Sequence, residues 1–139
     1  MYTVLDNNNS FMKDLEKLHK RNPRENLYLI FTGKKNPNSK KTQDGIYDFL
    51  VKNGRASGTV KFKNGEREIY SHPVSSVGSL NKNMRIQFLT FINNPPPKLW
   101  TFHFGPKNTD YIGWITIDDD KKEIKLWKCG KHADSYSSY

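Results

Sequence analysis

The chain has few of the features that small proteins use for covalent stabilisation or for entering membranes. Its 139 residues include one cysteine, Cys129, which excludes an internal disulfide framework and a zinc site built on several thiolates. No apolar run approaches the roughly 18–20 residues of a membrane-spanning helix. Residues 1–9 lack the basic and apolar regions of a secretory signal. These absences predict an intracellular protein, cytoplasmic or nuclear, with no metal, no cofactor and no membrane association.

Acidic residues are scarce beside basic ones. The 14 Asp and Glu face 23 Lys and Arg, which gives a formal net charge of +9. Aliphatic residues are few, but 8 Phe, 7 Tyr and 3 Trp can each bury a large area. A chain of this length fits one domain and can bury about two-thirds of its unfolded surface. We therefore expect residues 1–139 to form a single domain, with a polar leader at 1–9 and a frayed tail at 130–139.

One amphipathic helix is expected near the N-terminus. Ser10 is a suitable N-cap, and Pro23 follows the end of the pattern. Between them, apolar side chains recur at helical spacing at Phe11, Leu15 and Leu18. About three turns of helix do not persist alone in water, so we expect this helix to dock on a sheet.

The remaining apolar segments predict strands. The run at 27–32 is apolar at nearly every position, as in a central strand buried on both faces. Two Asn-Gly dipeptides, at 53–54 and 64–65, are typical of two-residue hairpin turns. The second turn sets a register in which Val60 faces Ile69 and Lys61 faces Glu68. The expected strands are 27–32, 46–52, 55–63, 66–72, 84–92, 99–104, 111–117 and 123–128.

This count predicts a mainly β (α+β) fold. About eight antiparallel strands in meanders would form a barrel or two packed sheets, with the N-terminal amphipathic helix over one opening or face. The alternative is an α+β fold in which residues 79–92 are helical, because Phe88, Phe91 and Ile92 also fit a helical stripe. The β-branched and aromatic residues of that segment favour the strand.

Positive charge concentrates in the first third of the chain. Residues 1–41 contain nine basic and four acidic residues, a net charge of +5. These cations lie on the expected helix and in a loop at 33–45, and most are lysines. Lysine is a point charge on a flexible stem, which suits contacts to phosphates more than to base edges. The candidates for nucleic-acid binding are Lys13, Lys17, Lys20, Arg21, Lys34, Lys35, Lys40 and Lys41.

Two aromatic residues are candidates for stacking on bases. Tyr70 and Trp127 lie in expected strands beside charged residues, as rings on a solvent-facing side of a sheet would. If these rings share a face with the lysine loop, nucleic-acid binding gains support. If the two sets oppose each other, that function loses most of its support.

The four histidines lack the spacing of a zinc-binding motif. A metal-free ribonuclease needs a general acid and a general base that titrate near neutral pH, and a cation for the phosphorane charge. His72 and His103 lie on different expected strands with many lysines available. They are the candidates for catalysis.

Three functions remain open at this point, and the sequence leaves the oligomeric state open too. The first is a non-enzymatic nucleic-acid-binding β domain that recognises RNA or a single strand by shape and backbone through its Lys-rich loop. The second is a protein–protein interaction module, an accessory or viral factor that uses a sheet edge or an aromatic patch. The third is a small basic, metal-free ribonuclease or toxin domain. We expect the first, and an RNA partner above all.

Overall fold

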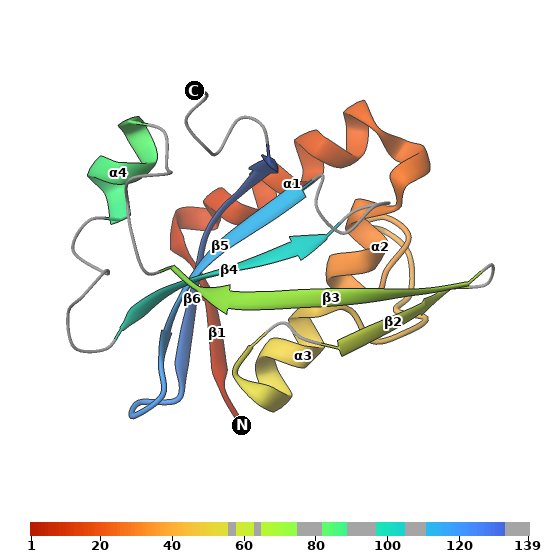
Figure 1. Ribbon diagram of the computed structural model, residues 1–139. Helices are drawn as coiled ribbons and strands as arrows, with labels where there is room; N and C mark the ends of the chain where they lie inside the picture. The colour runs from red at the N-terminus through yellow and green to blue at the C-terminus, as the bar shows by residue number, and fades with distance from the viewer. Residues whose placement is uncertain (56–57, 63–64, 75–81, 89–96, 105–110, 133–139) are drawn as a thin grey trace.

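An open mixed sheet in the order β1-β6-β5-β4-β3-β2 organises the chain (Figure 1). The computed structural model describes residues 1–55, 58–62, 65–74, 82–88, 97–104 and 111–132. Its strands are β1 Thr3–Asp6, β2 Gly58–Phe62, β3 Gly65–Pro73, β4 Lys98–Phe104, β5 Tyr111–Asp118 and β6 Glu123–Lys131. Its helices are η1 Asn7–Asn9, α1 Ser10–Arg21, η2 Pro23–Glu25, α2 Leu27–Thr32, α3 Ile46–Asn53 and α4 Lys82–Phe88.

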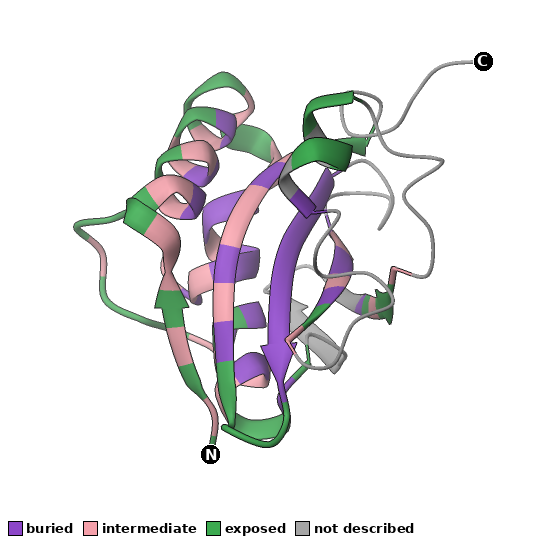
Figure 2. Ribbon diagram, turned by 90° about the vertical axis from the view of Figure 1, so that its left-hand side faces the viewer, coloured by how far each residue is buried: buried purple, intermediate pink, exposed green. Residues whose placement is uncertain are grey.

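Helices cover the two faces of the sheet unequally. Helices α1, α2 and α3 lie on one face, and α4 lies on the other, which we name the distal face (Figure 1). Along β4, Phe102 and Phe104 point toward α1, α2 and α3, whereas Leu99 and His103 alternate onto the distal face. Strand β5 is buried along its whole length between the two layers (Figure 2).

Aromatic rings join the helices to the sheet. The ring centroid of Phe31 on α2 lies 4.8 Å from that of Phe11 on α1 and 6.1 Å from that of Phe102 on β4. All three side chains are fully buried. On the distal face, Phe88 of α4 stacks on Trp114 at 5.7 Å and forms a smaller second core. The aromatic residues thus supply the core that the few aliphatic residues do not.

Asp6 caps α1, and the prediction that Ser10 does so is wrong. The Asp6 carboxylate accepts hydrogen bonds from the backbone N–H groups of Phe11 and Met12, both at 3.0 Å. A carboxylate is favourable there because the first turn has unpaired N–H groups and the positive end of the helix dipole. The predicted helix, its buried apolar stripe and its docking on a sheet are confirmed.

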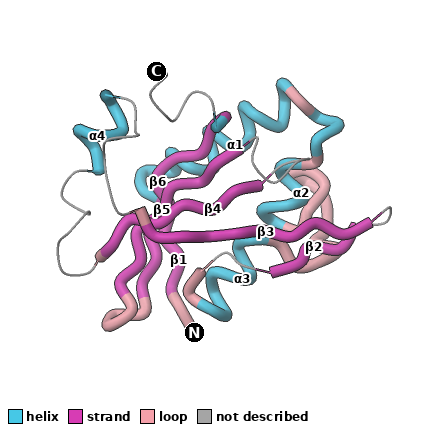
Figure 3. Tube along the Cα trace, viewed as in Figure 1, coloured by secondary structure: helices cyan, strands magenta, loops and turns pink. Residues whose placement is uncertain are grey.

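The segment at 27–32 is the helix α2, and the prediction of a central strand is wrong. Left-handed residues flank it, with φ of 56° at Asn26 and 79° at Gly33. The N–H of Gly33 donates to the carbonyl of Leu29 at 2.8 Å and ends the helix. Helix α2 lies among α1, α3 and the sheet (Figure 3), and burial on most sides requires the same continuous apolar run as a buried strand.

Helix α3 replaces the strand predicted at 46–52. Gly54 ends it with φ of 75°, and its N–H donates to the carbonyl of Leu50 at 2.9 Å. The Asn-Gly dipeptide at 53–54 is therefore a helix C-terminus and not a hairpin turn. Both structures need a glycine in the left-handed conformation, so the dipeptide alone does not separate them.

The β2–β3 hairpin lies where the second Asn-Gly dipeptide predicts it, but its register differs by two residues. Phe62 pairs with Gly65 and Lys61 pairs with Glu66. The innermost pair therefore encloses positions 63 and 64 rather than 64 and 65. Val60 therefore pairs with Arg67 and not with Ile69, which pairs with Gly58.

The later strands agree with the sequence, and the closed architecture does not. Strands β3, β4, β5 and β6 confirm the segments expected at 66–72, 99–104, 111–117 and 123–128. The strand expected at 84–92 is wrong, since 82–88 form α4, and the alternative of a helix within 79–92 is confirmed over those residues. Eight strands and a barrel are also wrong: β1 and β2 end the sheet on opposite sides.

Residues 3–6 of the expected leader form β1, which runs parallel to β6. Expectations for 75–81, 89–96, 105–110 and 133–139 lie outside the described residues.

The aromatic junction makes a test of the layer packing. We expect Phe31→Ala to lower the free energy of unfolding by about 3–5 kcal/mol, because the cavity would open between α1 and β4. The measurement is urea unfolding followed by tryptophan fluorescence. Ile86→Ala on α4 is the control, since its side chain is 71% exposed, and its loss should stay near 0.5 kcal/mol or below, as is usual for surface substitutions. Equal losses in the two variants would contradict the packing described here.

Candidate functional site

The exposed side of α1 carries the largest group of unpaired cations in the described residues. Lys13, Lys17, Lys20 and Arg21 are all exposed, as expected from the sequence. Their spacing of three to four residues places them along one side of the helix. Arg24 of η2 follows the end of α1 and is also exposed, and we missed it as a candidate. We name Lys13, Lys17, Lys20, Arg21 and Arg24 the α1 basic stripe.

The stripe reaches the edge of β6. The Asp14 carboxylate of α1 accepts a hydrogen bond from the backbone N–H of Cys129 at 3.3 Å. Burial raises the pKa of Asp14, while that hydrogen bond and the positive charges of Lys128 and Lys17 act in the opposite direction. Lys128 of β6 therefore lies near the stripe. Strand β1 pairs with residues 123–126 of β6, and helix α1 covers the part of that edge beyond them.

The lysine loop at 33–45 is only partly available to a ligand. Lys41 forms ion pairs with Asp48 and, at 3.8 Å, with Asp44, and Asp44 also bonds Lys52 at 3.0 Å. Lys34, which bridges to Lys41 through the backbone, is half-buried and lines a cavity of about 350 Å³ between α1, α2 and α3. Two further predicted lysines of the loop are exposed and without an acidic partner among the described residues, Lys35 and Lys40.

The stacking candidates lie away from these lysines. Tyr70 is 54% exposed and stands opposite His103 on the distal face. Trp127 also lies on the distal face, where it contacts Phe88 edge-on at 5.9 Å and its indole N–H donates to Thr116 Oγ1 at 2.9 Å. The lysine loop packs with α1, α2 and α3 on the other side of the sheet. The two sets therefore oppose each other across the sheet, and nucleic-acid binding through the lysine loop together with these rings loses most of its support.

The two catalytic candidates are brought together by the pairing of β3 with β4. His72 lies opposite Thr101, two pairs along from the Tyr70–His103 pair, and the Nε2 atoms of the two histidines are 2.9 Å apart. Nδ1 of His72 donates to the carbonyl of Pro73 at 3.1 Å, since a carbonyl only accepts. In neutral His72, Nε2 is then the acceptor, and the Nε2–H of His103 donates to it.

The environment of His103 disfavours its protonation. Burial lowers the pKa of His103, and the charges of His72 and of His132, whose ring centroid is 5.9 Å away, act in the same direction; together they bring this pKa to about 4. Nδ1 of His103 is buried and has no hydrogen-bond partner among the described residues. The pair thus holds His103 neutral at pH 7. Catalysis by His72 and His103 stays a prediction.

The described residues contain no group of three His, Cys, Asp or Glu side chains arranged to hold a metal ion. Within the same residues, no helix is both long and apolar enough to cross a membrane. Comparison of the chain with protein-family models, with curated proteins and with solved structures returned no match. The geometry of the side chains is therefore the basis for the function proposed below.

The histidine pair gives a prediction for pH dependence. The pKa of about 4 in the folded state lies below the unfolded value of 6.5, so the unfolded chain binds the proton more tightly. The stabilisation from neutral His103 should be complete above pH 6.5 and should decrease as the pH falls toward 4. We expect an NMR titration of the His103 ring to show a midpoint near 4, with the resonance assigned by its loss in His103→Gln. A midpoint at or above 6.5 would contradict the burial of this ring.

Proposed function

We propose that this protein is a non-enzymatic nucleic-acid-binding domain that binds the phosphate backbone of single-stranded RNA or DNA along α1. The observation that carries the proposal is the α1 basic stripe, whose five cations form no ion pair within 4 Å among the described residues. Cations spaced along one helix side match the repeating charge of a phosphate backbone. The binding surface is thus the helix rather than the loop at 33–45, where Asp44 and Asp48 already neutralise Lys41.

Recognition along this surface does not read sequence. Three of the five cations are lysines, which contact phosphates without distinguishing bases. Lys128 extends the charge toward the edge of β6, so the backbone of a bound strand has a path from α1 to the sheet. Tyr70 and Trp127 lie on the distal face, and strand binding along α1 therefore does not need them.

A protein partner has less support than nucleic acid. Large apolar side chains that are exposed in the described residues belong to different elements: Met1, Leu5 of β1, Tyr47 of α3, Tyr70 of β3 and Ile86 of α4. Scattered exposed apolar residues are normal for a monomeric surface and do not form the contiguous patch of an interface.

Two matched double variants test strand binding. Lys17→Gln/Arg21→Gln removes one Lys and one Arg from the stripe, and Lys82→Gln/Arg85→Gln removes the same pair from exposed positions of α4. Affinity for a fluorescent 20-nucleotide RNA is measured by polarisation over a salt series. We expect the α1 variant to bind more weakly and to reduce the slope of log affinity against log salt by about 1.4, which is two single-strand phosphate contacts at about 0.7 each. The α4 variant should match the wild type.

Either of two results would contradict the proposal. One is no binding by the wild type at low salt, and the other is an equal effect of the two double variants. An equal effect would mean that the affinity depends on net charge and not on the stripe.

The proximity of His72 and His103 supports a second candidate, cleavage of RNA. In such a step the neutral ring of His103 accepts the proton of a ribose 2′-hydroxyl, whose oxygen attacks the phosphorus, and the ring of His72 supplies a proton to the departing 5′ oxygen. The products are a 2′,3′-cyclic phosphate and a 5′-hydroxyl. A labelled RNA should then be cleaved by the wild type and by His19→Asn, and it should stay intact with His72→Asn or His103→Asn. Intact RNA after incubation with the wild type would exclude this activity.

A further inference from the structure

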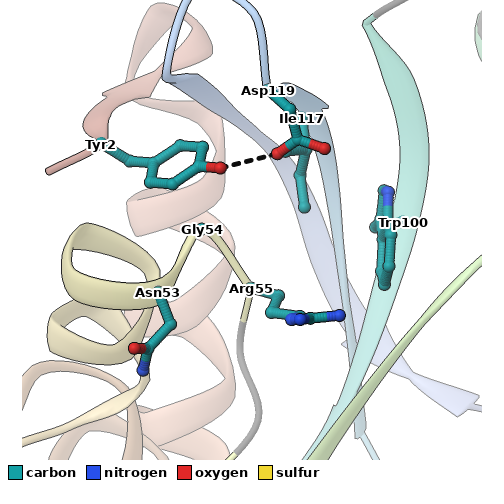
Figure 4. Close-up of a pocket in the computed structure, with 7 residues that line it drawn as sticks. All are labelled: Tyr2, Asn53, Gly54, Arg55, Trp100, Ile117 and Asp119. Carbon is teal, nitrogen blue, oxygen red and sulfur yellow. Dashed lines mark hydrogen bonds between the residues drawn. The ribbon is translucent and has the colours of Figure 1, made fainter.

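A polar pocket lies beside the N-terminus, at the opposite end of the molecule from the α4 helix. Its volume is about 250 Å³, and four separate parts of the chain line it (Figure 4). Tyr2 precedes β1, Arg55 follows α3, Trp100 lies on β4, and Asp119 follows β5. At roughly 30 Å³ for one water molecule, this volume has room for a single nucleobase and not for a base pair.

One wall of the pocket is fixed by several contacts. The backbone N–H of Tyr2 donates to the carbonyl of Val51 at 2.8 Å, and its hydroxyl donates to Asp119 Oδ1 at 2.7 Å. The ring of Tyr2 lies against Gly54, where a Cβ would come within 2.3 Å of it. Lys122 Nζ lies 4.9 Å from the centroid of the same ring. The wall is therefore held in place before any ligand binds, which lowers the entropic cost of binding.

The other groups in the pocket are free to bind a ligand. The Arg55 guanidinium makes no hydrogen bond or ion pair with a described residue and extends toward the half-buried indole of Trp100 (Figure 4). Asp119 lies across the opening beside Tyr2, and its Oδ2 accepts no hydrogen bond from a described residue. The pocket thus combines a fork of donors, a carboxylate acceptor and two aromatic rings.

These groups match the hydrogen-bonding edges of guanine. Guanine places two acceptors, O6 and N7, beside two donors, N1–H and N2–H₂. A bidentate arginine is the commonest specific partner of O6 and N7. A carboxylate accepts from the two donors, and an aromatic ring stacks on the base. Adenine carries an amino donor where guanine carries O6, so it would place that donor against the Arg55 donors.

We propose that this pocket binds one guanine base, with Arg55 on O6 and N7, Asp119 on N1–H and N2–H₂, and the base stacked on Trp100. A guanine in a single strand is the expected source of the base, and this part of the inference rests on the nucleic-acid binding proposed above. A free guanine nucleotide presents the same edges. Lys122 above the Tyr2 ring supplies a cation for the adjoining phosphate in either case.

The first experiment uses free mononucleotides, so that it does not depend on the α1 stripe. GMP, IMP, AMP, CMP and UMP are titrated into the full chain by isothermal titration calorimetry. We expect GMP to bind at least about tenfold more tightly than AMP, CMP or UMP, as a lost bidentate contact requires. IMP lacks the N2 amino group and should fall between GMP and AMP. Equal binding of the five nucleotides would overturn the proposal.

Matched variants assign the two contacts. Arg55→Gln and Asp119→Asn should each lower GMP affinity about tenfold or more and should reduce the preference for GMP over AMP. The controls are Arg85→Gln on α4 and Asp120→Asn, which changes the next acid of the same turn, and both should bind GMP as the wild type does. If Arg55→Gln and Asp119→Asn retain wild-type affinity and preference, the pocket is not the guanine site. Asp119→Asn leaves an oxygen to accept from Tyr2, so a loss there does not reflect a broken wall.

A final pair of oligonucleotides separates the two proposals and the two sources of the base. Two single-stranded RNA 9-mers are compared that differ only in one central position, G or A. Tighter binding of the G strand, with the preference lost in Arg55→Gln but kept in Lys17→Gln/Arg21→Gln, supports a strand guanine in the pocket. Salt-dependent binding of both strands alike, with no GMP binding, leaves the α1 proposal standing and overturns the guanine pocket. GMP binding with no strand binding supports the pocket as a free-nucleotide site and contradicts strand binding along α1.

Discussion

The contact of Phe102 with Phe11 and Phe31 is the interaction on which the rest of the structure depends. Phe102 stands on β4 near the middle of the sheet, and its ring lies 6.0 and 6.1 Å from the rings that α1 and α2 place on that face. The neighbouring strand makes room for it at Gly113, where a Cβ would come within 2.0 Å of the Phe102 ring. Since this junction fixes the rotation of α1 about its axis, it also determines which side of the helix faces solvent. The α1 basic stripe is exposed because the apolar stripe of the same helix is held against the sheet.

The sheet separates two kinds of chemistry. Cations gather on the layer of α1, while the distal face carries His72, His103 and the rings of Tyr70 and Trp127. Lys125 Nζ lies 5.3 Å from the centroid of the Trp127 ring. The α1 basic stripe and these rings are nevertheless on opposite sides, which differs from the shared platform on which many single-strand binders stack bases beside cations. The pocket beside Tyr2 offers another way to combine the two, because Arg55, Asp119 and Trp100 converge there at the end of the sheet, on the side of α3.

The parts of the fold that sequence reasoning predicted are those with a local period. The α1 stripe has one, and so does β4, and the exposed cations of α1 were therefore also predicted correctly. Trp127 of β6, expected as an exposed ring, is half-buried against Phe88. The run at 27–32 has no such period. A buried strand and a buried helix of six residues require the same apolar composition, so the sequence does not separate them. The error at 46–52 had a consequence for the site, because Lys41 is neutralised by Asp48, which lies on α3 and not on the strand predicted there. The closeness of His72 and His103, and the meeting of Arg55 with Asp119, come from long-range pairing that no local pattern specifies.

The parallel pairing of β1 with β6 joins the first strand of the chain to the last, since Val4 pairs with Ile124. Tyr2 and Asp119, 117 residues apart, depend on the same connection. Closing a loop of that length is entropically costly, and contacts between distant segments slow folding. During synthesis, β1 has no partner strand until the ribosome has made β6. The Tyr2 hydroxyl likewise has no acceptor until Asp119 has been made. Occupancy of that pocket would therefore mark a molecule in which β1 and β6 are paired, and a ligand there would stabilise that state over every intermediate that lacks β6.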